Sequence, residues 1–393
     1  MKPKNIIYAF VLLVLPLFIA AQSGIVNKGM KIIVEENYAI ILGSDMNLTN
    51  QNNGTILLDG MIQVESDVIN NSSTSNMFIN TNNMGTLVLN GASEQTLGGS
   101  GKIALDNLEV SSAGVNLETD IEQNGMLIFN SGRVNLHDNH YLFNTTGSIS
   151  GTYSVNNMFV SSGIGEVRKS FSSAGTFTFP VGEETEIREY SPAVINIASV
   201  SGNSGSYVGL TVTDQKYFAN SSTSEYLSRF WRFSGNEINS INYSATFYYT
   251  DDDIVGSESA IYATAFTESA RIPYSTVNAT NNSFSVSNQT EFAAFTGTDG
   301  STGILDLIEH KLLVYPNPAS SYIDLELPDF LVGNIKVDLI NQQGSVMKDE
   351  LLKELDYSAQ RQARISVGEI SPGLYYLRFI TRDGIIQKKI VLE

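Results

Sequence analysis

The sequence predicts an all-β protein, and three observations lead to that prediction. Short apolar runs between glycines and asparagines fill residues 22–160, with almost no helical periodicity. Alternating, aromatic-rich segments follow over residues 161–295, and alternation returns over residues 311–393. Strand-like runs separated by Gly- and Asn-rich turns are typical of β architectures. We therefore expect a β-solenoid, a middle antiparallel β-sandwich and a small C-terminal β-domain.

The composition argues against several classes of function. The chain has 393 residues, enough for two or three domains with their own cores. Its formal net charge is −18, which disfavours nucleic-acid binding because that function needs a basic surface. The chain contains no cysteine, so neither a disulfide framework nor a thiolate metal site is available.

The N-terminus has the pattern of a signal peptide. Lys2 and Lys4 precede an apolar run from Ile6 to Ile19, and small residues follow it. The run is shorter than the roughly 20 residues that a membrane-spanning helix needs. We predict a signal peptide over residues 1–21 with cleavage after Ala21, and no transmembrane segment in the mature form.

Residues 22–160 repeat a pattern in which a strand-like run follows a glycine. The clearest examples are NGTILLDG (53–60), MGTLVLNG (84–91), SGKIALDN (100–107) and NGMLIFN (124–130). Their spacing is uneven and centres on about two dozen residues, which is typical of the stacked turns of a solenoid. We predict a Gly/Asn-rich β-solenoid of the right-handed β-helix type. A pair of ordinary β-sandwiches with glycine-rich turns is the alternative.

The middle of the chain changes character. Its strand-like segments are longer and richer in aromatic residues, and one of them, residues 226–233, contains the only Trp. This spacing favours an antiparallel β-sandwich module over residues 161–295. A Gly-, Ser- and Thr-containing stretch then predicts a linker over residues 296–310.

The run LLVYPNPASSYIDLEL (312–327) opens the C-terminal domain, which we place at residues 311–393. Pro316 and Pro318 donate no backbone hydrogen bond, so they predict an entry turn rather than the middle of a strand. Behind the turn, Ile323, Leu325 and Leu327 alternate with polar residues and are expected to face a core. Residues 349–364 have a more helix-like pattern than a plain loop.

These C-terminal residues resemble the type IX secretion C-terminal sorting domain, type A, of a group of Gram-negative bacteria. The resemblance rests on three motifs in order: VYPNPA (314–319), VDLINQQG (337–344), and SPGLYYLR (371–378) with the closing KKIVL (388–392). The residues that carry the sorting motif are Tyr315, Pro316, Asn317, Pro318, Gly344, Pro372, Gly373, Lys388 and Lys389.

The resemblance implies an immunoglobulin-like β-sandwich that the type IX secretion machinery recognises and that a sorting peptidase removes. In the family, a lipopolysaccharide anchor usually replaces the domain. The protein is therefore expected to travel through the periplasm and to be secreted or held at the outer-membrane surface.

Three local clusters carry side chains of metal-binding or catalytic type, and each has a simpler structural interpretation. His137 and His140 enclose Asp138 and Asn139, a composition that suits a solvated turn better than a zinc site. The run Asp251–Asp253 offers carboxylates for Ca²⁺ but lacks the spacing of a calcium loop, so an exposed hairpin is favoured. Residues 183–186 hold three glutamates, and Arg188 and Glu189 follow in the same turn of the predicted sandwich, which argues against a glycosidase pair of carboxylates.

No catalytic, cofactor-binding or metal-binding residue is predicted, and we expect a non-enzymatic adhesin or matrix component that binds glycans or matrix. Tyr243, Tyr248 and Tyr249 are candidate stacking positions for such a ligand, although packing is favoured for them. The alternative is a carbohydrate-active enzyme, a polysaccharide lyase or hydrolase on a β-helix. Arg133 is then the basic residue whose loss tests activity.

Overall fold

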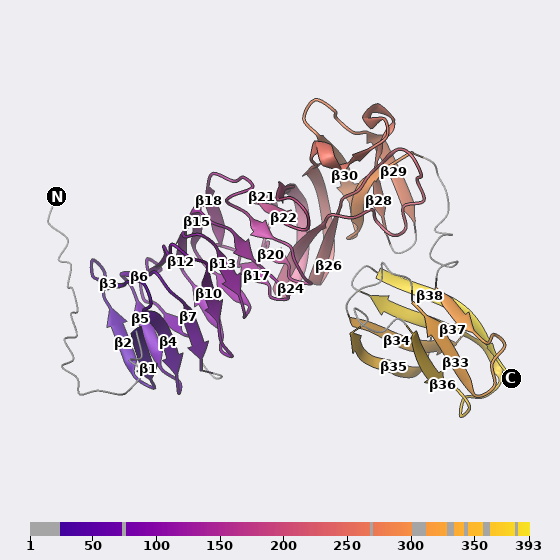
Figure 1. Ribbon diagram of the computed structural model, residues 1–393, viewed down its shortest axis with the longest axis horizontal. Helices are drawn as coiled ribbons and strands as arrows, with labels where there is room; N and C mark the ends of the chain where they lie inside the picture. The colour runs from indigo at the N-terminus through magenta and orange to yellow at the C-terminus, as the bar shows by residue number, and fades with distance from the viewer. Residues whose placement is uncertain are drawn as a thin grey trace. The chain divides into compact units, whose positions relative to one another are not determined.

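A computed structural model describes residues 24–72, 76–267, 270–300, 312–327, 334–341, 345–356, 362–381 and 384–393. The all-β prediction is confirmed, with an N-terminal β-solenoid, sandwich-like sheets and a C-terminal domain (Figure 1). Helical structure in these residues is limited to two 3-10 turns, η1 (Asp251–Asp253) and η2 (Glu258–Ala260). No helix among them is long and apolar enough to cross a membrane.

The described residues form two compact units. The first contains the residues up to Asp214 together with Trp231–Asp253 and Asn278–Phe292. The second contains Gln215–Phe230, Ile254–Val277 and Ala293–Glu393. The solenoid lies in the first unit and the C-terminal domain in the second, whereas the predicted sandwich of residues 161–295 contributes strands to both.

The solenoid has about seven turns, and most turns contribute one strand to each of three faces. The β1 face contains β1 (Gly24–Lys28), β4 (Asn47–Gln51), β7 (Val68–Asn71), β10 (Gln95–Gly98), β13 (Val115–Leu117), β16 (Val134–Asn135), β19 (Phe159–Val160) and β22 (Val181–Glu183), followed by β23 (Glu189–Tyr190). The β3 face contains β3 (Ala39–Leu42), β6 (Met61–Val64), β9 (Thr86–Leu89), β12 (Asn107–Ser111), β15 (Met126–Ser131) and β18 (Ser148–Gly151).

The β2 face consists of two successive sheets. The first contains β2 (Lys31–Val34), β5 (Thr55–Leu58) and β8 (Phe78–Ile79); the second begins with β11 (Ile103–Leu105), β14 (Ile121–Gln123), β17 (Tyr141–Phe143) and β20 (Val167–Lys169). Pairing on all three faces is parallel as far as β20 and β22. The parallel ladder therefore continues past residue 160, the predicted end of the solenoid, because β20 and β22 pair with β17 and β19 in the same way as the strands before them.

Close stacking of the turns explains the glycines that precede the strands. A Cβ atom on Gly85, before β9, would overlap the carbonyl oxygen of Leu58 in the preceding turn. Glycine is the residue that permits such an approach of two backbones. Inside the turns, aliphatic side chains such as Ile56, Ile62 and Leu87 are fully buried. The predicted Gly-flanked runs are thus the strands β5, β9, β11 and β15.

An asparagine ladder crosses the interior of the first turns. Asn27 Nδ2 donates to Asn50 Oδ1 at 3.1 Å, and Asn50 Nδ2 donates to Asn70 Oδ1 at 3.0 Å. Asn50 Nδ2 also donates to the carbonyl of Gly54 at 2.7 Å. The three residues occupy one register position on β1, β4 and β7, and all are buried. The ladder satisfies polar groups at a corner that water does not reach.

Lys169, on β20, also satisfies polar groups in the interior of the solenoid. Its Nζ donates to the carbonyl oxygens of Asn144, Thr145 and Gly147 at 2.7, 3.0 and 2.7 Å. Burial lowers the pKa of Lys169 to about 8. The side chain fastens β20 to the turn of residues 144–147, which follows β17.

We expect Lys169→Met to lower the free energy of unfolding of the solenoid by about 2–3 kcal/mol, because three carbonyls lose a charged donor. The midpoint of urea unfolding of the solenoid measures the effect. Lys102→Met is the matched control: Lys102 is half-exposed and pairs with Glu122 at 2.7 Å, so its loss changes stability by less than about 1 kcal/mol. Equal effects of the two substitutions would contradict the prediction.

Beyond the solenoid, the strands of the first unit become antiparallel. They are β21 (Gly175–Phe179), β24 (Ala193–Thr213), β26 (Phe230–Tyr248) and β30 (Ser283–Gln289). β24 pairs antiparallel with β20, so the β2 face continues into the sandwich-like part without a linker. Rings of Trp231, Phe247 and Phe284 lie 5.0 to 5.6 Å apart and form its core.

The second unit holds β25 (Tyr226–Leu227), β27 (Ile254–Val255), β28 (Tyr262–Phe266), β29 (Arg271–Thr276) and β31 (Ala294–Thr298). β28 pairs antiparallel with β29 on one side and with β31 on the other. Thr296, Gly297 and Thr298 are buried in β31, so the linker that we placed at residues 296–310 does not begin at residue 296. Residues 301–310 of that prediction lie outside the described residues.

The C-terminal domain contains two antiparallel sheets. One is β32 (Leu313–Tyr315), β33 (Tyr322–Glu326) and β36 (Gln362–Ser366); the other is β35 (Val346–Asp356), β34 (Asn334–Asn341), β37 (Gly373–Thr381) and β38 (Gly384–Leu392). Ile323, Leu325 and Leu327 are buried, as their alternation predicted. The helix-like expectation for residues 349–364 is wrong: residues up to Asp356 continue β35, because pairing with β34 outweighs local helix propensity.

Candidate functional site

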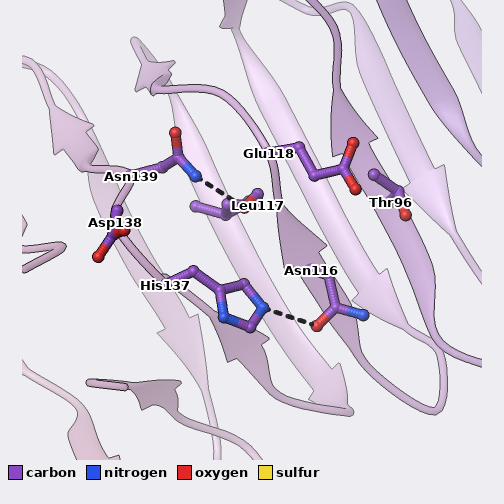
Figure 2. A pocket seen from close by; sticks show the side chains of 7 residues that line it. All are labelled: Thr96, Asn116, Leu117, Glu118, His137, Asp138 and Asn139. Atoms are coloured by element: carbon purple, nitrogen blue, oxygen red, sulfur yellow. Dashed lines mark hydrogen bonds between the residues drawn. The ribbon is translucent and has the colours of Figure 1, made fainter. Parts of the chain in front are cut away.

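A groove on the β1 face of the solenoid is the best candidate for a binding site. Its volume is about 530 Å³. Seven residues line it: Thr96, Asn116, Leu117, Glu118, His137, Asp138 and Asn139 (Figure 2). They come from three successive turns of the solenoid. Thr96 is on β10, Asn116 and Leu117 are on β13 with Glu118 directly after it, and residues 137–139 follow β16.

Parallel stacking builds the floor of this groove. Thr96, Asn116 and Asn135 share one register position on β10, β13 and β16, so their side chains form an outward-facing column. Asn135 Nδ2 donates to Asn116 Oδ1 at 2.9 Å. His137 Nε2 lies 3.3 Å from the same oxygen, which accepts its hydrogen (Figure 2). These two hydrogen bonds orient the amide of Asn116 in the column.

The groove has acidic groups on two of its turns. Glu118 follows β13, and no other group described in the structure forms a hydrogen bond or ion pair with its carboxylate. Asp138 follows β16, and its Oδ1 accepts a hydrogen bond from the amide of Ile164 at 3.2 Å. No Lys or Arg lines the groove. The groove thus offers carboxylate, hydroxyl, amide and imidazole groups, a set that suits a ligand rich in hydroxyl groups.

The two histidines of the predicted solvated turn differ in exposure. His137 lines the groove and is exposed, with a positive φ of 50°. His140 is half-buried, and its Nδ1 accepts a hydrogen bond from the amide of Glu166 at 3.1 Å. Burial lowers the pKa of His140, and the nearby cation of Arg168 lowers it further. Neither belongs to a three-residue metal cluster in the described part of the chain.

Arg133, the basic residue that the lyase alternative depends on, is held in ion pairs. Its guanidinium contacts Glu184 and lies 3.9 Å from Glu94. Glu184 also pairs with Arg188 at 3.0 Å. Glu184 is therefore held by arginines, and Glu183 is buried and accepts a hydrogen bond from the amide of Thr185.

One carboxylate cluster was only partly foreseen. Single carboxylate oxygens of Glu183, Glu189 and Asp214 lie within 4.8 Å of one another, and the first two are buried. Glu183 and Glu189 face each other across β22 and β23. The sequence placed both in one turn but missed Asp214, which follows β24. All three also contact other groups of the protein, so the cluster does not by itself define a metal site.

The residues Asp251–Asp253 form the 3-10 turn η1, in which Asp251 and Asp252 are exposed, as favoured from the sequence, and Asp253 is not. Asp253 is buried, and its Oδ2 accepts the amide of Thr250 at 2.8 Å. Asp251 Oδ1 accepts Asn282 Nδ2 at 2.6 Å. Among the tyrosines proposed for stacking, Tyr243 and Tyr249 are buried, and Tyr248 is 37% exposed. The first two therefore pack in the core, as favoured from the sequence.

In the C-terminal domain, the Pro-Asn-Pro turn docks on the last strand. Asn317 Nδ2 donates to the carbonyl of Lys389 at 3.0 Å, and the amide of Val391 donates to Asn317 Oδ1 at 2.9 Å. Ala319 then exchanges backbone hydrogen bonds with the end of β38. The first and last motifs of the predicted set are thus brought together.

The other residues of the sorting motif lie nearby or outside the described part. Pro372 is exposed and Gly373 begins β37, pairing with Leu392 of β38. Lys388 and Lys389 are on β38, opposite Leu377 and Tyr376. Gly344 and the cleavage residue Ala21 lie outside the described residues. The roles of all these residues in sorting stay predictions.

Comparison with known proteins identifies one part of the chain. Residues 313–393 match the family model described as the secretion system C-terminal sorting domain. Neither the curated proteins nor the solved structures gave a match to this chain. The matched residues are those of β32 to β38, whose two sheets and docked Pro-Asn-Pro turn are described above. The chain therefore ends in a type IX secretion C-terminal sorting domain.

Proposed function

We propose that this exported protein is a non-enzymatic binding protein of the cell surface or extracellular matrix, and that the groove on the β1 face binds a neutral, hydroxyl-rich glycan. Export follows from the sorting domain, which indicates secretion or delivery to the cell surface. The observation that carries the binding proposal is the groove itself, in which Glu118 and Asp138 lie beside the hydrogen-bonded column that contains Asn116.

The charges of the groove favour a neutral ligand. Two carboxylates line it and no Lys or Arg does, in a chain of net charge −18. Uronate-rich polymers are repelled by such a surface. Sugar hydroxyls donate well to carboxylates, and a preorganised column loses little side-chain entropy on binding.

The contacts of Arg133 support binding without catalysis. Arg133, the candidate base of a lyase, is only 14% exposed at its side chain and pairs with glutamates. A base engaged in this way is not available to take a proton from a sugar ring.

We expect Glu118→Ala to weaken glycan binding about tenfold or more, because a charge-assisted hydrogen bond is lost. Binding of the purified protein to an array of neutral and anionic polysaccharides, followed by titration of the best ligand, measures this. Glu65→Ala is the matched control, since Glu65 follows β6, away from the groove lining, and carries the same charge.

Two results would contradict the proposal. One is binding that Glu118→Ala and Glu65→Ala weaken equally, which would remove the groove from the interaction. The other is release of reducing or unsaturated sugar ends during incubation, lost in Arg133→Ala, which would favour the enzyme alternative.

A further inference from the structure

The first turn of the solenoid presents three strand edges. β1, β2 and β3 each begin a sheet and pair on one side only, with β4, β5 and β6, among the strands that the structure describes. The unpaired edges carry a row of backbone donors and acceptors that can pair with another strand. We call the edges of β1, β2 and β3 together the terminal edge.

Apolar side chains gather around the terminal edge. Met30 is 71% exposed and Ile33 is 53% exposed, and three further apolar residues of residues 30–46 are among the exposed large ones: Tyr38, Ile41 and Met46. Such a concentration on one turn marks an interaction surface in soluble proteins.

The inward-facing residues of the first turn are also incompletely covered. Ile32 and Ile40 are half-buried, whereas their register partners Ile56 and Ile62 in the second turn are fully buried. One more layer of strands on the terminal edge would bury them. The far end of the solenoid differs, because antiparallel β24 pairs with β20 and β23 pairs with β22.

The β2 strand is complementary in charge to a second copy of itself. When two copies pair antiparallel about Ile33, Lys31 of one lies opposite Glu35 of the other, and both are exposed. This register also sets inward-facing Ile32 opposite inward-facing Val34. A register shifted by one residue would set inward side chains against outward ones.

We propose that the terminal edge binds the terminal edge of a second copy of this chain, forming a head-to-head dimer. A two-fold axis through Ile33 pairs β2 with its copy and brings β1 of each copy to β3 of the other. The contact is the same on both copies, so it closes at two. The closed far end of the solenoid prevents growth into a fibre.

Charge reversal tests this geometry. We expect the purified protein of residues 22–393, without the predicted signal peptide, to sediment at twice the mass of a monomer, and Lys31→Glu or Glu35→Lys alone to raise the dimer dissociation constant about tenfold or more. Mixing the two variants restores the dimer, because position 31 of each copy then again faces a position 35 of opposite charge in the other copy. Both side chains are exposed, so neither change should disturb folding.

Substitution of the apolar centre gives an independent test. Ile33→Asp is expected to give a monomer, while Met84→Asp, at a 62% exposed position before β9, keeps the dimer. A wild-type chain that stays monomeric over a wide concentration range would overturn the proposal, because the terminal edge would then not bind a second copy. A dimer that persists in Ile33→Asp, or that mixing fails to restore, would overturn it as well.

Discussion

Replacement of Asn50 by alanine is expected to lower the free energy of unfolding of the solenoid by about 3–4 kcal/mol. Asn50 is fully buried and makes three hydrogen bonds through its amide, to Asn27, Gly54 and Asn70. Removal of the side chain leaves Asn70 Oδ1 and the Gly54 carbonyl without the Asn50 donor, and Asn27 Nδ2 without the Asn50 acceptor. Asn70 Oδ1 keeps the amide of Ser72, and Asn27 Nδ2 keeps the carbonyls of Met30 and Thr55, so the desolvation cost falls mainly on the Gly54 carbonyl and adds to the loss of the packed side chain.

The measurement is the urea midpoint of the solenoid transition, with hydrogen exchange of β1, β4 and β7 as a local readout. Asn196→Ala is the control: Asn196 is exposed on β24, and its Oδ1 accepts a hydrogen bond from Thr176 at 3.4 Å. That control should change stability by less than about 0.5 kcal/mol. A loss of the same size in both variants would show that the ladder contributes no special stability.

The elements that depend on local alternation were predictable from the sequence. The period of two in a strand places Ile323, Leu325 and Leu327 on one face whatever partner the strand finds. The glycines before β5, β9, β11 and β15 were also found, because a close approach of two backbones requires glycine at that position of the sequence. The sorting domain was identified for the same reason, since its motifs are short and contiguous.

The features that depend on register between distant turns were not predictable. The four Gly-flanked runs belong to two different faces, β5 and β11 to the β2 face and β9 and β15 to the β3 face. Their uneven spacing reflects this alternation between faces. The turns themselves also differ in length. The turn from Gly24 to its pairing partner Asn47 is longer than the turn from Val115 to its partner Val134.

The candidate groove shows the same limit. Thr96, Asn116 and Glu118 were not singled out, because none of them stands in a local motif. They meet only once the parallel register stacks β10, β13 and β16. A search for polar residues at outward positions one turn apart would have found this column. Such a search requires the pairing register of the strands, which the sequence does not provide.

Deletion of residues 313–393 is expected to abolish delivery to the cell surface and leave the truncated protein in the periplasm. These residues contain all of β32 to β38, whose two sheets are formed from these strands alone. The deletion therefore leaves the strands of the solenoid paired as before. Surface protease digestion of whole cells and immunoblotting of periplasm and medium measure the distribution. A truncated protein that still reaches the surface would contradict export by the sorting domain.

The folded state of the domain should matter as much as its presence. Leu339 is fully buried on β34 opposite Leu377, so Leu339→Asp places an unpaired charge in the core at a cost of about 4 kcal/mol or more. We expect this variant to be retained like the deletion, while Met347→Asp, at a 52% exposed position on β35, is exported normally. Export of both variants at the wild-type level would show that the machinery recognises a linear segment, and that the docked Pro-Asn-Pro turn and the two sheets are not part of the signal.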